Sequence, residues 1–65
     1  MTAIEVKAAF SVTPADFTHI KHFIEQNPGR VRQGTLIYGG KRPLPFGEHQ
    51  GTPLWALPLV MFAGG

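Results

Sequence analysis

The side chains that could do chemistry in this sequence begin with Glu5 and Lys7, two positions apart in the apolar run of residues 3–10. Alternate side chains of a β-strand point to the same face, so we expect Glu5 and Lys7 to lie side by side. Ile4 and Val6 are then expected to be buried behind them. A carboxylate that binds a hard cation, next to an ammonium that holds water or phosphate, is what phosphodiester hydrolysis requires. Glu5 and Lys7 are therefore candidate catalytic residues, with Glu5 also a candidate metal ligand.

The same two residues also suit a solvated or cross-strand ion pair, which is the usual role of charged pairs on strand faces. Catalysis needs a further acid to complete a magnesium site, because such sites combine one or two carboxylates with substrate phosphates. Glu48 is the nearest candidate for that acid, and Asp16 and Glu25 are expected on a helix. Without such an acid, we expect no magnesium cofactor and no cleavage of DNA by a monomer.

Three histidines form a second candidate site. His19 and His22 are one helical turn apart and could ligate a metal together with His49. The simpler interpretation is that they are solvated residues on a polar helix face, because no cysteine or acidic residue is placed to complete a tetrahedral site.

Length and composition indicate one small domain, residues 1–65, that depends on association. A chain of 65 residues without cysteine has no disulfide to stabilise a small core. It is 43% hydrophobic and 15% charged, so we expect apolar surface to remain for a partner, either a second copy in a homodimer or another protein chain. The candidate partner-binding residues, in an uncharged C-terminal segment 53–65, are Leu54, Trp55, Leu57, Leu59, Met61 and Phe62.

The net charge of +2 is a mild basic bias that alone does not indicate nucleic-acid binding. The cations that flank the second expected strand could contact phosphates, although a solubilising rim is the favoured interpretation; they are Arg30, Arg32, Lys41 and Arg42. No signal-peptide pattern is present, and segment 53–65 is shorter than the ~20 residues that span a membrane. We therefore expect a cytoplasmic protein without membrane contact.

One helix is well marked by its start and end. Thr13 suits the N-cap and Pro14 the first helical position, and Asp16 can reach back to the cap with its carboxylate. Asn27-Pro28-Gly29 is expected to end the helix at about Gln26. Before this helix we expect a strand, and after it we expect a strand at 34–38, a turn with an irregular or edge segment at 41–47, a polar loop at 48–52 and a short strand at 53–57. The order predicts an α/β fold, a mixed sheet of about three strands with one helix on one face.

Five segments in order carry a resemblance to a known family: Ile4–Ala8, Thr13–Phe17, Gly34–Gly40, Leu44–Gly47 and Leu54–Leu59. From residue 3 to about residue 59, the chain resembles the C-terminal end of a widespread bacterial group of AAA-type ATPases, whose last domain is restriction-endonuclease-like, of the PD-(D/E)XK kind. The resemblance implies part of a restriction-endonuclease-like core. It also implies that Glu5 is the metal-binding carboxylate and Lys7 the lysine of the Glu-x-Lys pair.

The resemblance further implies an acid on a preceding strand, and a P-loop ATPase module, but this sequence holds no Gly-x-x-x-x-Gly-Lys-Ser/Thr pattern. We expect a non-catalytic remnant of the nuclease-like domain that acts as a self-association or protein-interaction module. One alternative is a magnesium-dependent nuclease, completed when oligomerisation brings another acid to Glu5 and Lys7. The other is weak DNA binding through the basic rim.

Overall fold

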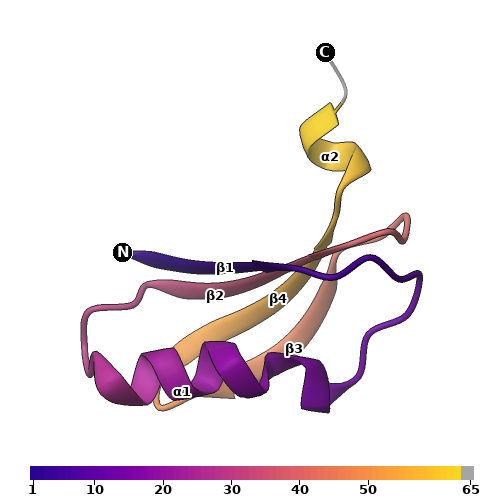
Figure 1. The fold of residues 1–65 in the computed structure, drawn as a ribbon. Coiled ribbons are helices and arrows are strands. Elements are labelled where there is room, and N and C mark those ends of the chain that lie inside the picture. The colour runs from indigo at the N-terminus through magenta and orange to yellow at the C-terminus, as the bar shows by residue number, and fades with distance from the viewer. Residues whose placement is uncertain (64–65) are drawn as a thin grey trace.

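The chain folds into a four-stranded mixed sheet with one helix packed on one face (Figure 1). The structure is a computed structural model that describes residues 1–63. This confirms the predicted α/β class, with one strand more than the three expected. The elements in chain order are β1 (Thr2–Val6), a 3₁₀ turn η1 (Pro14–Phe17), α1 (Thr18–Gln26), β2 (Gln33–Tyr38), β3 (Leu44–His49), β4 (Thr52–Pro58) and α2 (Val60–Ala63).

The helix begins and ends where the sequence predicts, because local hydrogen bonds satisfy its terminal backbone groups. The Thr13 N–H donates to the Asp16 carboxylate at 2.7 Å, and Pro14 occupies the first turn. The first turn is 3₁₀ and continues directly into α1. At the other end, the Asn27 side-chain amide donates to the carbonyl of Phe23 at 2.9 Å. Residues 14–26 therefore form one helical segment held at both ends.

The sheet order is β1-β2-β4-β3, with β1, β2 and β4 parallel and β3 antiparallel to β4. The segment expected to be irregular or at an edge is β3, which is an edge strand. Its pairing with β4 shifts register between Pro45 and Glu48, where Gly47 has a φ of +73°. A proline is tolerated there because an edge strand does not need every N–H for its ladder.

The polar segment expected as a loop at 48–52 is instead a tight turn. Gln50 and Gly51 form the turn with φ values of 50° and 82°, and the flanking residues His49 and Thr52 are paired. Two consecutive left-handed residues are typical of a two-residue hairpin turn that matches the twist of the strands. The hairpin extends β3 to His49 and starts β4 at Thr52.

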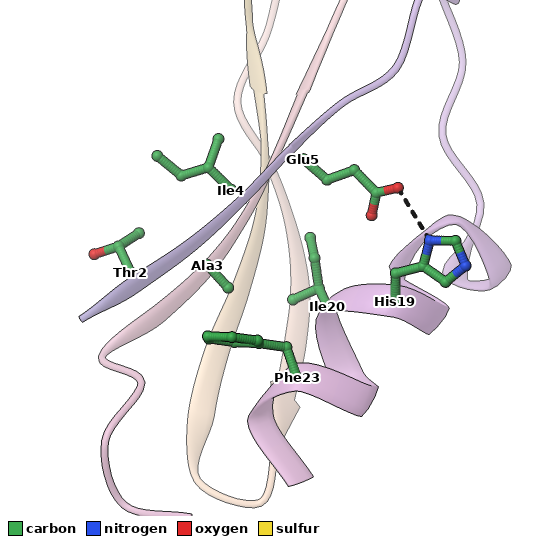
Figure 2. A pocket seen from close by; sticks show the side chains of 7 residues that line it. All are labelled: Thr2, Ala3, Ile4, Glu5, His19, Ile20 and Phe23. Atoms are coloured by element: carbon green, nitrogen blue, oxygen red, sulfur yellow. Dashed lines mark ion pairs between the residues drawn. The ribbon is translucent and has the colours of Figure 1, made fainter. Parts of the chain in front are cut away.

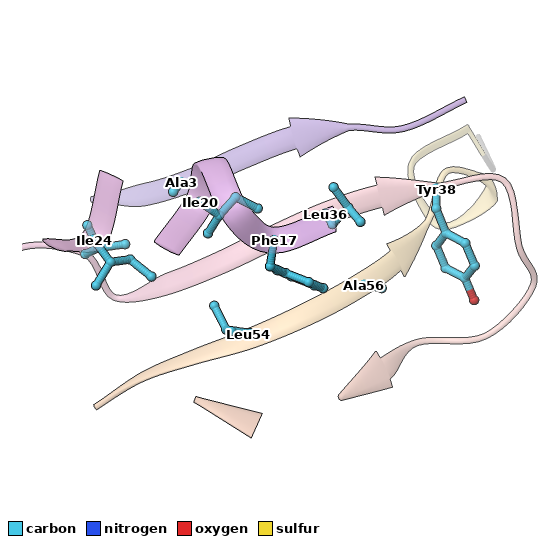
Figure 3. Close-up of a cluster of buried hydrophobic side chains, with 9 residues drawn as sticks. Ala3, Phe17, Ile20, Ile24, Leu36, Tyr38, Leu54 and Ala56 are labelled. Atoms are coloured by element: carbon cyan, nitrogen blue, oxygen red, sulfur yellow. The ribbon is translucent and has the colours of Figure 1, made fainter. Parts of the chain in front are cut away.

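The hydrophobic core lies between α1 and the sheet face that α1 covers (Figure 3). Phe17 is fully buried, and its ring centroid lies 4.9 Å from that of Phe46 on β3. A Cβ added at Gly34 would meet the Ile20 Cγ2 atom at 2.6 Å, so glycine lets α1 approach β2 closely. The buried hydrophobic residues are Ala3, Phe17, Ile20, Ile24, Val31, Leu36, Tyr38, Leu54 and Ala56.

The prediction that Ile4 and Val6 are buried is wrong, because the helix packs on the opposite face of β1. Their exposed fractions are 62% and 66%, whereas Ala3 is 9% exposed. On the helix-covered face, Ala3, Gly34 and Ala56 are small enough to admit the side chains of α1. Ile4 and Val6, which alternate with Ala3 along β1, therefore lie on the other side of the sheet.

That other side is the open face, on which no element packs within residues 1–63. The sheet register places Ile4, Thr35 and Trp55 in one row across it. Figure 1 shows α1 on the opposite side of the sheet and α2 projecting beyond the end of β4. The apolar residues of the open face are Ile4, Val6, Ile37, Trp55 and Leu57. Neither α1 nor α2, the helices that residues 1–63 contain, is long and apolar enough to cross a membrane.

We predict that Phe17→Ala lowers the free energy of unfolding by about 3–5 kcal/mol, because it empties the centre of the core. Phe10→Ala is the matched control, since Phe10 is 86% exposed, and we expect its effect to stay within about 0.5 kcal/mol. Urea denaturation followed by circular dichroism measures both changes. Equal losses for the two variants would contradict the placement of the core beneath α1.

Candidate functional site

Glu5 and Lys7 lie on the helix-covered side of the sheet, next to the start of the helical segment. Both are partly buried, in line with their place on the same face as Ala3. This placement agrees with the prediction that the Glu5 and Lys7 side chains share a face. They do not, however, lie on an exposed surface with an apolar layer behind them. Each is held by a different residue of the helical segment.

Lys7 is bound to Asp16. Its ammonium Nζ lies 2.6 Å from the Asp16 Oδ2 atom, with 30% and 23% of the two side chains exposed. The same Asp16 oxygen accepts the Thr13 N–H at 2.7 Å and the Thr13 hydroxyl at 3.3 Å. The hydrogen bond from Lys7 and then that from the Thr13 N–H lower the pKa of Asp16 below its ordinary value of 3.8. Lys7 thus connects the chain just after β1 to the helix start, with its ammonium bound to a carboxylate.

Glu5 lies at one end of a groove between β1 and α1 (Figure 2). Its Oε1 atom is 3.4 Å from the His19 Nδ1 atom, and the His19 side chain is 86% exposed. Its Oε2 atom is buried and has no hydrogen-bond partner within the described residues. The groove has a volume of about 360 Å³ and is lined by Thr2, Ala3, Ile4, Glu5, His19, Ile20 and Phe23.

The acid expected to complete a site with Glu5 is not beside it. Glu48 is on β3, three strands away from β1 in the sheet order, which at ~4.8 Å per strand is about 14 Å. Glu25 instead contacts His49, with 2.7 Å between the Glu25 Oε2 and His49 Nε2 atoms. Mg²⁺ favours several oxygen ligands, and Glu5 with the His19 ring does not supply them. The residues around Glu5 in this chain therefore do not fit a magnesium site by themselves.

The three histidines do not converge either. His19 lies beside Glu5 near the start of α1, whereas His49 pairs with Glu25 near the end of α1. His22 is exposed on the helix between them. Among residues 1–63, no group of three or more His, Cys, Asp or Glu side chains is placed to hold a metal ion.

The candidate phosphate-binding cations form two separate pairs. Arg30 and Arg32 precede β2, and their backbone groups bond to Met1, with 2.7 Å between the Arg32 N and Met1 O atoms. Lys41 and Arg42 follow β2, so six strand residues at ~3.3 Å each, or about 20 Å, separate the two pairs. All four side chains are exposed. This arrangement resembles a rim more than a single basic patch.

The candidate partner-binding residues fall into three environments. Leu54 is 2% exposed and belongs to the core beneath α1. Trp55 and Leu57 are half-buried on the open face. Leu59, Met61 and Phe62, exposed by 53%, 55% and 59%, lie at and beyond the end of β4.

Beside these last residues is a second, mostly apolar groove of about 290 Å³ at the carboxyl ends of β1 and β2. Its lining includes Val6 and Ile37 from the open face, Phe10 from the loop after β1, and Leu59. Sequence patterns alone point to segment 53–65, but Ile4 and Val6, with exposed fractions of 62% and 66%, add further exposed apolar surface on β1. Once the face that α1 covers is known, the alternation of side chains along β1 predicts that Ile4 and Val6 are exposed.

Comparison with protein-family models, with curated proteins and with solved structures finds no match for this chain. A function for it has to be argued from its own residues and their geometry.

We predict that Lys7→Met raises the pKa of Asp16, because Lys7 makes the strongest of the contacts that lower it. A carboxyl group with a lowered pKa stabilises the fold above about pH 3.8 and loses that effect as the pH falls through its folded value. The stability difference between wild type and Lys7→Met should therefore be largest near neutral pH and shrink in acid. NMR titration of the Asp16 carboxyl carbon and denaturation at several pH values measure both effects.

Lys41→Met is the matched control, because Lys41 is exposed in the loop after β2. We expect it to leave the Asp16 titration unchanged. An Asp16 pKa that does not move in Lys7→Met would show that the Lys7–Asp16 contact is not maintained in solution.

Proposed function

We propose that this chain is a non-catalytic association module that binds a second copy of itself, or another protein chain, through apolar surface at β1. The observation that carries the proposal is the exposure of Ile4 and Val6, at 62% and 66%, on a strand at the edge of the sheet. Natural proteins usually blunt an edge strand with charge, proline or a bulge, because it otherwise pairs with another chain. β1 has no proline and no bulge, its one charged residue, Glu5, points toward α1, and two β-branched apolar residues lie on its outer surface.

The open face supports the same proposal. Four strands at ~4.8 Å spacing and about five residues at ~3.3 Å each give a face on the order of 300 Å². With the exposed residues beyond β4, a face of this size compares with the largest patches on ordinary monomers, roughly 300–600 Å², which often mark interaction sites. The area is thus sufficient for a weak association and small for a permanent one.

The geometry around Glu5 and Lys7 supports the non-catalytic part of the proposal. Lys7 is neutralised by Asp16, and Glu48 is at the opposite edge of the sheet. We interpret the Glu5–Lys7 pair as a mark of descent from the nuclease-like domain at the end of bacterial AAA-type ATPases. In this chain, Lys7 and Asp16 connect β1 to the helix start, which is a structural role.

We predict that the purified chain has a solution mass above 7.1 kDa that rises with concentration, as measured by multi-angle light scattering. Val6→Lys should lower this association at least tenfold, because a charge on an edge strand opposes pairing. Phe10→Lys is the control, since Phe10 is also apolar and, at 86%, even more exposed than Val6 but lies in the loop after β1. A chain that stays monomeric at the highest accessible concentration would contradict the self-association proposal.

A further inference from the structure

The two edges of the sheet are unequal. β3 is blunted by Pro45, by the irregular register before Glu48, and by the Glu48 charge. β1 has no proline and is paired in regular register with β2 along its whole length. Within residues 1–63, its other edge has no neighbouring strand. We call this the free edge of β1.

The sheet register shows which backbone groups face the free edge. In a parallel ladder, the N–H and C=O of one residue point to the same side of the strand. Lys7 donates its N–H to the Ile37 carbonyl at 2.8 Å, and the Met1 carbonyl accepts the Arg32 N–H at 2.7 Å, so the odd-numbered residues of β1 face β2. The N–H and C=O groups of Thr2, Ile4 and Val6 therefore face the free edge.

We infer that β1 of a second copy pairs antiparallel with this free edge, with Ile4 opposite Ile4 on the two-fold axis. This inference rests on the proposed self-association and specifies its geometry. In this register Thr2 lies opposite Val6, so all outward N–H and C=O groups of both strands are paired. A shift by two residues leaves either Thr2 or Val6 without a β1 partner.

Side chains favour the same register. On the helix-covered side, Ala3 of one copy lies opposite Glu5 of the other, so no like charges meet. The register shifted to place Ile4 opposite Val6 puts Glu5 opposite Glu5, which is destabilising. On the open face, Ile4 packs against Ile4 and Val6 against Thr2, so the strand residues with the largest exposed fractions gain cross-strand neighbours.

The groove beside Glu5 leaves room for the second strand. Figure 2 shows β1 running past the helix, with Ile20 and Phe23 directed from α1 toward the groove. Phe23 is 39% exposed at this position although it belongs to the apolar side of α1. A small side chain such as Ala3 of the second copy can enter the groove without displacing Phe23.

The pairing also explains why a second copy suits this edge better than an unrelated strand. Two four-stranded sheets joined through β1 give the order β3-β4-β2-β1-β1-β2-β4-β3, in which both remaining edges are the blunted β3 strands. The assembly is therefore closed at the dimer. Because a pair of five-residue strands buries less than the ~800 Å² per partner of a standard interface, the dimer is expected to be weak.

Covalent trapping is the sharpest test, because the chain has no cysteine of its own. A hydrogen-bonded antiparallel pair has its Cα atoms about 5.5 Å apart, within the roughly 4.4–6.8 Å that a disulfide spans. Under mild oxidation, Ile4→Cys should therefore form a disulfide-linked dimer at least tenfold faster than Val6→Cys. The two Val6 positions lie about 13 Å apart in this register. A mixture of Thr2→Cys and Val6→Cys should form the mixed dimer.

The outcomes separate this inference from the proposed function. If the wild-type chain associates but Ile4→Cys and Val6→Cys link at equal rates, or neither links, the register is wrong and self-association stands. If the wild-type chain is monomeric, both fail. As a second measurement, Ile4→Pro removes an N–H that faces away from β2, so we expect the circular dichroism spectrum to be kept and the dimer to be lost. Ile4→Thr, which keeps the N–H, should still dimerise, and a dimer that persists in Ile4→Pro overturns the inference.

Discussion

The packing of α1 on one face of the sheet is the interaction on which the rest of the structure depends. Phe17 is fully buried with its ring 4.9 Å from that of Phe46 on β3, and Ile24, which is 2% exposed, lies beside Gly34 of β2. A single helix can cover only one side of a sheet. Once α1 takes the side with the small residues Gly34 and Ala56, every large side chain on the opposite side stays uncovered within the described chain. The open face is thus a consequence of how the core is packed.

The same packing decides what the charged residues in and just after β1 can do. Glu5 and Lys7 are turned toward the helical segment, where Asp16 binds Lys7 at 2.6 Å and His19 approaches Glu5. Asp16 also accepts the Thr13 N–H, so one carboxylate both caps the start of the helix and connects it to Lys7, the residue after β1. A lysine in such a contact stabilises the fold and is not available as a free ammonium. A pattern that indicates catalysis in the sequence can therefore serve architecture in the fold.

Sequence patterns predicted the elements well where local chemistry determines them. The helix is marked by residues at its two ends, whatever surrounds it. Thr13 and Asp16 cap its start, and Asn27 follows its last residue. Which face of β1 is buried is not predictable in this way. The alternation of apolar and charged residues alone assigns Ile4 and Val6 to the interior. That choice depends on which face α1 covers, and the fit of α1 to Gly34 and Ala56 is a tertiary property. The distance between Glu48 and Glu5 likewise follows from strand order, which residue spacing does not contain.

Association and folding are coupled in a chain of this size. A domain of 65 residues buries only about 60% of the surface that its unfolded chain exposes, so its stability is a small difference between large terms. Any binding that requires the folded state adds to that stability in proportion to the logarithm of the ligand concentration. If the ligand is a second copy, the fold itself becomes more stable as the protein becomes more concentrated. In the monomer, Ile4 and Val6 leave apolar surface in water, which lowers its stability. In the assembled state the same side chains are buried, so they make that state the more stable one.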